Sequence, residues 1–204
     1  MDTKASQDLA HIKEMMERSS RFISLSGLSG VGAGIAGAAA GITAMCLVNE
    51  STGGNTIALM GGAREGLIRS LVILGIVTLL VAVFFGCFFT MRKSRRLGLN
   101  VWTSSTKQIL INLALPLVAG GIFVLALLYH ELFGLVAGAT LIFYGLALIN
   151  AGKYTYSDIK YLGMLEILLG CISLFWLGKG LLLWTIGFGL LHIVYGIILY
   201  KKYR

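Results

Sequence analysis

The chain has 204 residues, of which 57% are hydrophobic and 13% are charged, and its formal net charge is +8 at pH 7. With a mean hydropathy of +0.85 it is far more apolar than soluble domains, which indicates a protein of the lipid bilayer. The positive charge does not indicate nucleic-acid binding, because Lys and Arg lie between apolar segments and do not form a stripe with interleaved aromatic residues. A nucleic-acid partner is therefore excluded.

Residues 1–21 are predicted to form a short amphipathic helix on the cytoplasmic side. Leu9, Ile12 and Met16 share one helical face, opposite the charged residues of the segment. Such a helix either lies on the lipid headgroups or offers a docking surface to a cytosolic protein, and the residues leave both interpretations open. Residues 22–204 are then expected to form one transmembrane domain.

Six apolar segments follow, each long enough to cross a hydrocarbon core of about 30 Å as an α-helix. They are residues 23–48, 67–91, 108–129, 132–150, 159–177 and 181–200. The predicted fold class is all-α: a polytopic membrane protein with a bundle of six transmembrane helices, arranged as three hairpins.

The distribution of basic residues predicts the orientation of this bundle. Fourteen Lys and Arg residues fall in the N-terminal segment, the second and fourth loops and the tail, whereas the other side holds only Arg64, Arg69 and Lys179. Because positive residues are retained on the cytoplasmic side, both termini are predicted to be cytoplasmic.

The first apolar segment carries four glycines on one helical face. Gly30, Gly34, Gly37 and Gly41 recur at spacings of four and three residues. Small residues let two helix backbones approach closely in a membrane, so this face is expected to pack against a neighbouring helix inside the bundle.

Two ionisable residues stand out in the last hairpin. Glu166 and His192 each lie about thirteen residues from the turn at Gly178–Gly180, so they should share one depth near the bilayer midplane. A charged side chain at that depth costs roughly 2.5–3.5 kcal/mol on insertion scales, so both are expected to point into the bundle and to meet. Glycine positions on the same two faces, 163 and 170 on one helix and 189 and 196 on the other, are expected to face each other as well.

Three roles for this pair remain open. It is a proton relay or ion-coupling site, a structural interhelical hydrogen bond worth on the order of 1 kcal/mol, or part of a metal or catalytic site. The last role has the least support, because two ligands are too few and catalytic motifs are absent, so no catalytic residue, metal or cofactor is predicted and an enzymatic activity is not favoured. The polar core is predicted to comprise Glu166, His192, Tyr195, Tyr144 and Asn112.

A weak internal repeat links the last two hairpins. A shift of 51 positions aligns five residues of the segment 135–149 with identical residues near the end of the chain, which indicates a tandem duplication of hairpins with one orientation. The aligned pairs are Gly138 with Gly189, Ile142 with Ile193, Tyr144 with Tyr195, Gly145 with Gly196 and Leu148 with Leu199.

Charged residues also gather at the predicted outer surface. Arg64, Glu65 and Arg69 precede or open the second apolar segment, and His130 and Glu131 form the turn between the third and fourth. They form either an outer vestibule for a charged solute or ordinary helix-end charges, with Glu65 and Arg69 paired across one helical turn.

The run of residues Met16–Gly30, with the sequence MERSSRFISLSGLSG, resembles the start of a group of six-helix bacterial inner-membrane proteins of about this size. This resemblance implies a multi-pass location in the bacterial inner (cytoplasmic) membrane, and it implies no activity.

Two functions are consistent with these residues. The first is proton-linked or small-solute permeation through the bundle. The alternative is a non-catalytic membrane scaffold or regulatory module, which either binds a cytosolic protein through its N-terminal helix or associates with further copies of itself.

Overall fold

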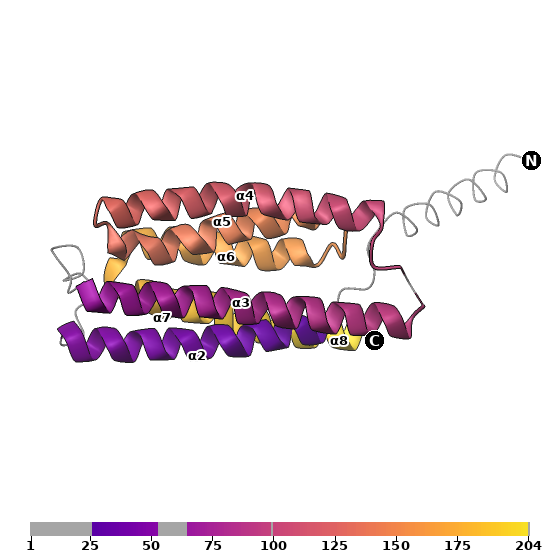
Figure 1. The fold of residues 1–204 in the computed structure, drawn as a ribbon, viewed down its shortest axis with the longest axis horizontal. Helices are drawn as coiled ribbons and strands as arrows, with labels where there is room; N and C mark the ends of the chain where they lie inside the picture. Colours follow the sequence, from indigo (N-terminus) through magenta and orange to yellow (C-terminus); the bar gives the residue numbers. More distant parts are fainter. Residues whose placement is uncertain (1–25, 53–64, 99, 204) are drawn as a thin grey trace, which may run out of the picture.

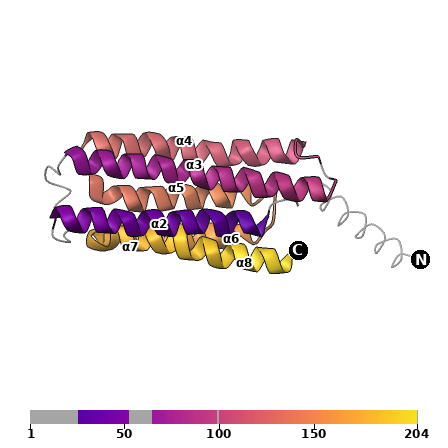
Figure 2. The ribbon, with the colours of Figure 1, turned by 60° about the horizontal axis from the view of Figure 1, so that its bottom comes forward.

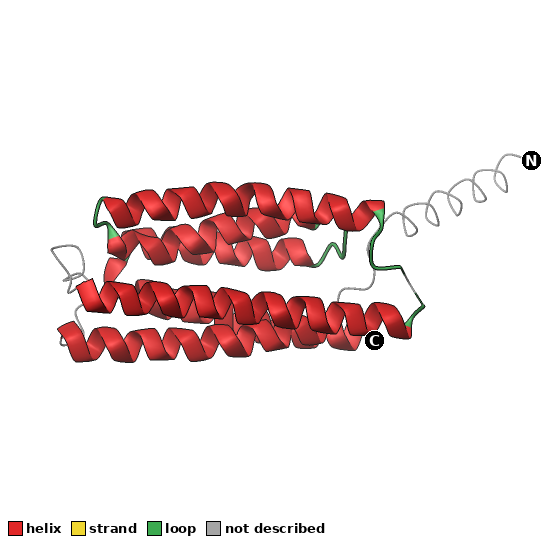
Figure 3. Cartoon of the chain, viewed as in Figure 1, coloured by secondary structure: helices red, strands yellow, loops and turns green. Residues whose placement is uncertain are grey.

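Helices form all the regular structure in the part of the chain that the computed structural model describes, which comprises residues 26–52, 65–98 and 100–203 (Figure 3). The predicted amphipathic helix at residues 1–21 and the predicted vestibule residue Arg64 lie outside the described residues. The all-α class expected from the sequence is confirmed within these ranges.

Six rods of helix account for the six apolar segments. Five rods are α2 (Gly27–Thr52), α3 (Glu65–Arg96), α4 (Ser104–Tyr129), the short η2 (Phe133–Leu135) with α5 (Val136–Ala151), and α6 (Ile159–Phe175). The sixth, which we call the final rod, joins η3 (Leu177–Lys179), α7 (Gly180–Thr185), the π-helical η4 (Ile186–Leu191) and α8 (His192–Lys202). Among the described residues, five rods are long and apolar enough to cross a membrane, and α6 with its 17 residues is slightly shorter than the others.

The rods form two groups of three. In one group α4 packs on α5 and α5 packs on α6; in the other α2 packs on both α3 and the final rod (Figure 1). The two groups meet through α7 and η4, which contact α5 and α6. Figure 2 shows that the rods run nearly parallel or antiparallel to one another.

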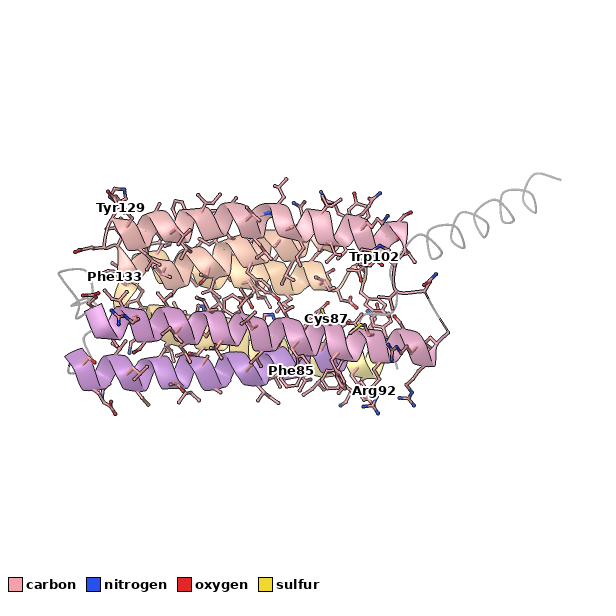
Figure 4. All side chains as sticks on the ribbon, in the orientation of Figure 1. Phe85, Cys87, Arg92, Trp102, Tyr129 and Phe133 are labelled. Atoms are coloured by element: carbon pink, nitrogen blue, oxygen red, sulfur yellow. The ribbon has the colours of Figure 1, made fainter. Side chains whose placement is uncertain are left out.

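The bundle has two distinct ends. At one of them α2 begins, α3 ends and the chain terminates; we call it the carboxyl-terminal end and the opposite one the distal end (Figure 1). Arg92 and Trp102 lie toward the carboxyl-terminal end, whereas Tyr129 and Phe133 lie at the distal end (Figure 4). Aromatic side chains therefore mark both ends of α4, as they do at membrane interfaces.

The glycine face of α2 lies directly against the final rod. A Cβ atom added at Gly34 would lie 2.7 Å from the backbone nitrogen of Ile193, and one added at Gly30 would lie 3.1 Å from Cα of Gly196. Gly37 meets Phe188 and Gly41 meets the side chain of Thr185 in the same way. The close approach of these two backbones requires residues without a side chain on this face.

The contact between α5 and α6 repeats this arrangement. A Cβ at Gly170 would lie 2.9 Å from the carbonyl oxygen of Gly138 and 2.6 Å from Cγ1 of Ile142. The corresponding distances from Gly34 are 2.8 Å to the carbonyl oxygen of Gly189 and 2.7 Å to Cγ1 of Ile193. The residues related by the shift of 51 positions therefore make equivalent contacts, each with a different helix.

This arrangement corrects one expectation about the glycines. Gly163 and Gly170 of α6 face α5, and Gly189 and Gly196 of the final rod face α2, so the two sets do not face each other. The reason is that the π-helical segment and α7 bring the final rod against α6 mainly near positions 166 and 173, and its glycine face is already covered by α2.

A cluster of buried apolar residues lies near the distal end. Val48 and Leu67 are almost completely buried there, where α2 ends and α3 begins. Leu47, Leu71, Phe133 and Leu181 pack around them, so four of the rods contribute to this cluster.

Candidate functional site

The two anomalous side chains meet where the two groups of helices touch. Glu166 on α6 is completely buried and His192, the first residue of α8, is 5% exposed. Nδ1 of His192 lies 3.3 Å from Oε1 of Glu166. These contacts confirm the prediction of a buried pair. The two residues lie at one depth because they are equally far from the turn that joins their helices.

Both ring nitrogens of His192 have hydrogen-bond partners. Nδ1 is 2.9 Å from the carbonyl oxygen of Gly187, and Nε2 is 2.9 Å from the hydroxyl oxygen of Tyr144. A carbonyl oxygen can only accept, so this bond requires a hydrogen on Nδ1. In the neutral ring Nε2 then accepts the hydrogen of the Tyr144 hydroxyl.

The π-helical segment positions the carbonyl that holds His192. Gly187 lies five residues before His192, and the segment Ile186–Leu191 widens the helix over that interval. A single wide turn of this kind often occurs at functional sites. Gly187 itself has no space for a side chain, since an added Cβ would lie 2.5 Å from Oε2 of Glu166 and 2.6 Å from Cδ2 of Leu141.

The carboxyl group of Glu166 is the unsatisfied member of the site. Neither of its oxygens has a hydrogen-bond partner among the described residues. The 3.3 Å contact with Nδ1 is short enough for an ion pair, but it is not a directed hydrogen bond, because the Nδ1 hydrogen points toward the carbonyl of Gly187. A buried polar atom left in this condition costs about 1–3 kcal/mol, and more for a charged group.

Aromatic rings cover the pair on one side. Phe188 lies with its ring centroid 5.0 Å from that of Tyr144 and 4.8 Å from that of Trp184. Its ring also stacks on the imidazole of His192 at 5.9 Å. These rings exclude bulk water and leave the pair in a medium of low dielectric constant, where charge interactions are strong.

The other predicted members of the polar core lie in different places. Tyr144 bonds directly to His192, whereas the hydroxyl oxygen of Tyr195 is buried without a partner among the described residues. The amide nitrogen of Asn112 donates to the carbonyl of Gln108, 2.8 Å away on its own helix. The structure therefore brings Tyr144 to the pair and directs the Asn112 side chain to its own backbone.

The predicted vestibule residues that the structure describes all lie at the distal end. Arg69 and Glu65 form an exposed ion pair at 3.2 Å across one turn of α3. The imidazole of His130 packs edge-on against Tyr129 at 5.2 Å, and Glu131 adopts a left-handed backbone conformation with φ of 58° in the turn that follows α4. Exposed pairs of this kind contribute little to stability.

A second polar cluster lies at the carboxyl-terminal end, and sequence reasoning missed it. Asp158 accepts hydrogen bonds from Lys202 at 2.8 Å and from the hydroxyl of Tyr203 at 3.0 Å. The ring of Tyr203 stacks on Tyr156 at 3.9 Å, and Lys93 donates to the Tyr203 carbonyl at 2.9 Å. These contacts tie the tail to the start of α6 and to the end of α3.

The charges in this cluster follow from its contacts. The hydrogen bond from Lys202 holds the pKa of the Asp158 carboxyl below its ordinary value, and burial raises the pKa of Tyr156 to about 12. From the sequence, Lys202 is interpreted only as a topology determinant. Asp158 lies 44 residues away in the sequence, so no local pattern predicts their pairing.

The helices and this site define an all-α, multi-pass membrane protein, by helix length and hydropathy, with a buried Glu–His pair between two helix groups. The sequence matches no family model, and searches of curated proteins and of solved structures find no match either.

Proposed function

We propose that this chain moves protons, or a small solute coupled to protons, across the bacterial inner membrane, and that Glu166 and His192 form the site where the proton binds. Both termini are assigned to the cytoplasm. This orientation is supported by the basic residues at the carboxyl-terminal end, where α3 ends in Lys93, Arg95 and Arg96 and α8 ends in Lys201 and Lys202.

The condition of the Glu166 carboxyl carries this proposal. A pair retained only for packing would have its hydrogen bonds satisfied on both sides, because unsatisfied buried groups are destabilising. Here His192 has two hydrogen-bond partners and Glu166 has none among the described residues. A carboxyl group without fixed partners can gain and lose a proton without breaking other bonds.

Position in the bundle supports the same function. The pair lies where α6 and the final rod bring the two helix groups together, so a change in its charge acts on the contact between the groups. Ionisable residues inside membrane helices commonly mark ion pathways and proton relays for this reason.

The test is a flux measurement in proteoliposomes that carry an imposed pH gradient. We expect pH-dependent flux with the natural protein and its loss in Glu166→Gln, which keeps the side-chain shape and removes the titratable proton. Glu50→Gln is the matched control. Glu50 is exposed near the end of α2, so this variant should show the same flux as the natural protein.

Absence of flux from the natural protein would overturn the proposal in favour of the alternative, a membrane module that binds a cytosolic protein or associates with itself. Deletion of residues 1–20 then distinguishes the two forms of that alternative. Loss of a co-purifying protein supports N-terminal docking, whereas an unchanged oligomer in detergent supports association through the helices.

A further inference from the structure

We propose, as an extension of the function above, that the transported species is the proton itself, which moves along one line of side chains through the bundle. From the distal half to the carboxyl-terminal end this line comprises Ser173, Glu166, His192 with Tyr144, Tyr195 and Asp158. The inference rests on the proposed function, and it specifies both the ion and its path.

Buried polar atoms without partners mark this line. Five side-chain atoms in the described part of the chain are buried and make no hydrogen bond: both carboxyl oxygens of Glu166, and the hydroxyl oxygens of Ser173, Tyr195 and Ser94. Four of the five belong to residues of the proposed line, and the fifth is the Ser94 hydroxyl on α3. Since more than 90% of buried polar groups are normally hydrogen-bonded, this concentration calls for a physical reason.

The order of the groups follows from the helices that carry them. Ser173 lies seven residues after Glu166 on α6, which places it about 10 Å nearer the distal end. Opposite these two residues the final rod has glycines at the same spacing of seven, and an added Cβ at Gly180 would lie 3.3 Å from the Ser173 hydroxyl oxygen. The α6 face with the two polar residues is therefore covered by a rod surface without side chains.

The line continues on the other side of the pair. Tyr195 lies one turn beyond His192 toward the carboxyl-terminal end, and its hydroxyl oxygen is buried without a hydrogen-bond partner among the described residues. Asp158, directly before α6, accepts two hydrogen bonds at that end of the bundle. The proposed path needs ordered waters between successive groups, such as the interval of about 10 Å along α6 between Glu166 and Ser173, and each such water makes about three hydrogen bonds to otherwise unsatisfied atoms.

The space beside Glu166 excludes a larger permeant on the side of Gly187. A methyl group at position 187 would lie 2.5 Å from Oε2 of Glu166 and 2.6 Å from the side chain of Leu141, which is itself completely buried. The carboxyl group therefore leaves no space for an organic solute on the side that faces Gly187. A proton needs no such space, because it moves by exchange along hydrogen bonds.

The transfer at the pair is a simple proton exchange. Nε2 of His192 takes the hydroxyl proton of Tyr144, an ordered water between the pair and Tyr195 returns a proton to the Tyr144 oxygen, and the ring becomes an imidazolium. When the ring turns and its Nδ1 hydrogen leaves the Gly187 carbonyl, that proton passes to Oε1 of Glu166, 3.3 Å away, and leaves a neutral ring and a neutral carboxylic acid. Glu166 releases the proton toward Ser173, and a tautomeric shift of the ring, which neither gains nor loses a proton, restores the starting state.

The experiment measures proton flux alone. Proteoliposomes with an internal pH-sensitive dye receive a voltage from a potassium gradient and valinomycin, in buffer without any organic solute. We expect the natural protein to conduct protons, and Ser173→Ala and Tyr195→Phe each to lower the flux about tenfold, which corresponds to about 1.4 kcal/mol on the barrier. The matched controls Ser70→Ala and Tyr161→Phe should conduct normally, because Ser70 bonds to its own helix and Tyr161 is exposed.

The outcomes separate this inference from the function on which it rests. Absence of any flux with the natural protein overturns both. Proton flux that needs an added solute and is lost in Glu166→Gln overturns the proton as sole permeant and retains the proposed function, whereas flux carried by sodium or potassium without proton movement overturns both. Proton flux that is lost in Glu166→Gln but unchanged in both Ser173→Ala and Tyr195→Phe overturns the path.

Thermal unfolding in detergent identifies variants that fail to fold, for which Ser173→Cys and Tyr195→His supply the second test.

Discussion

Gly187 and Glu166 face each other across the contact between η4 and α6, so closely that a Cβ on residue 187 would lie 2.5 Å from Oε2 of the carboxyl group. The same glycine holds the imidazole of His192 through its carbonyl oxygen. One residue thus determines both the space around the acid and the orientation of its partner.

Replacement of this glycine is therefore expected to damage the site. In Gly187→Ala the new methyl group collides with Oε2 of Glu166 and Cδ2 of Leu141, and because both side chains are fully buried, each can shift only against packed neighbours. We expect a loss of about 1–3 kcal/mol in the free energy of unfolding, the usual cost of overpacking. Denaturation in detergent measures it, with Gly121→Ala as the control: its surroundings are open, so the same change should be neutral or stabilising. Equal stability of the two variants would contradict the geometry.

The two members of the pair should respond differently to removal. Glu166→Met removes a group without hydrogen bonds, whereas His192 keeps its bonds to Gly187 and Tyr144, so we expect unchanged or higher stability. His192→Leu removes the only ionic partner that the carboxyl group has among the described residues, and should cost about 3–5 kcal/mol. Unfolding of both variants in the same detergent checks this asymmetry. A larger loss in Glu166→Met than in His192→Leu would show that the acid is the structural member.

The two equivalent glycine contacts predict equivalent sensitivity. Leucine at position 34 should separate α2 from the final rod, and leucine at position 170 should separate α6 from α5, because backbone and side-chain atoms lie within 3.0 Å of each added Cβ. Gly86→Leu on α3 is the matched control, since nothing lies within 4 Å of its Cβ position. We expect both Gly34→Leu and Gly170→Leu to lose the folded, monodisperse species in size-exclusion chromatography while Gly86→Leu retains it. Normal elution of either contact variant would refute the close packing on that side.

The cluster at the carboxyl-terminal end predicts a pH dependence of stability. The pKa of Asp158 is lowered by the hydrogen bond from Lys202, so its contribution is present in full above the ordinary pKa of an unfolded aspartate, about 3.9, and is lost as the pH falls through the lower, folded value. Asp158→Asn should therefore melt at a lower temperature than the natural protein at pH 7, and the difference should decrease toward pH 3. The contribution is small, because Lys202 is exposed to solvent. A difference that grows on acidification would have the wrong sign for this pair.

The helices themselves followed from local properties of the chain. Apolar segments long enough to cross a bilayer are helical wherever the structure describes them, because a backbone in lipid must satisfy its own hydrogen bonds. The meeting of Glu166 with His192 also followed, since equal distance from one turn places two residues of a hairpin at one depth.

The partners of each helix face could not be derived in this way. A stripe of glycines shows that another backbone comes close, but it does not say which one, and the glycines at positions 163 and 170 meet α5 instead of the final rod. The sequence likewise did not show which of the two predicted tyrosines, Tyr144 or Tyr195, bonds to His192. Tyr144 contacts His192 from a third helix, α5, whereas the hydroxyl of Tyr195, one turn from His192 in the sequence, makes no hydrogen bond to the pair.

By itself, the sequence determined that the chain is an all-α bundle of apolar helices with two ionisable residues at matching depth. Hydropathy and helical periodicity are properties of each segment alone, and they need no knowledge of its neighbours. Only the tertiary structure decided that the Gly187 carbonyl fixes the tautomer of His192, that the Glu166 carboxyl lacks hydrogen bonds, and that Asp158 holds the tail. These relationships join residues on different rods or depend on a single π-helical turn, and they arise when side chains compete for the same space between packed helices.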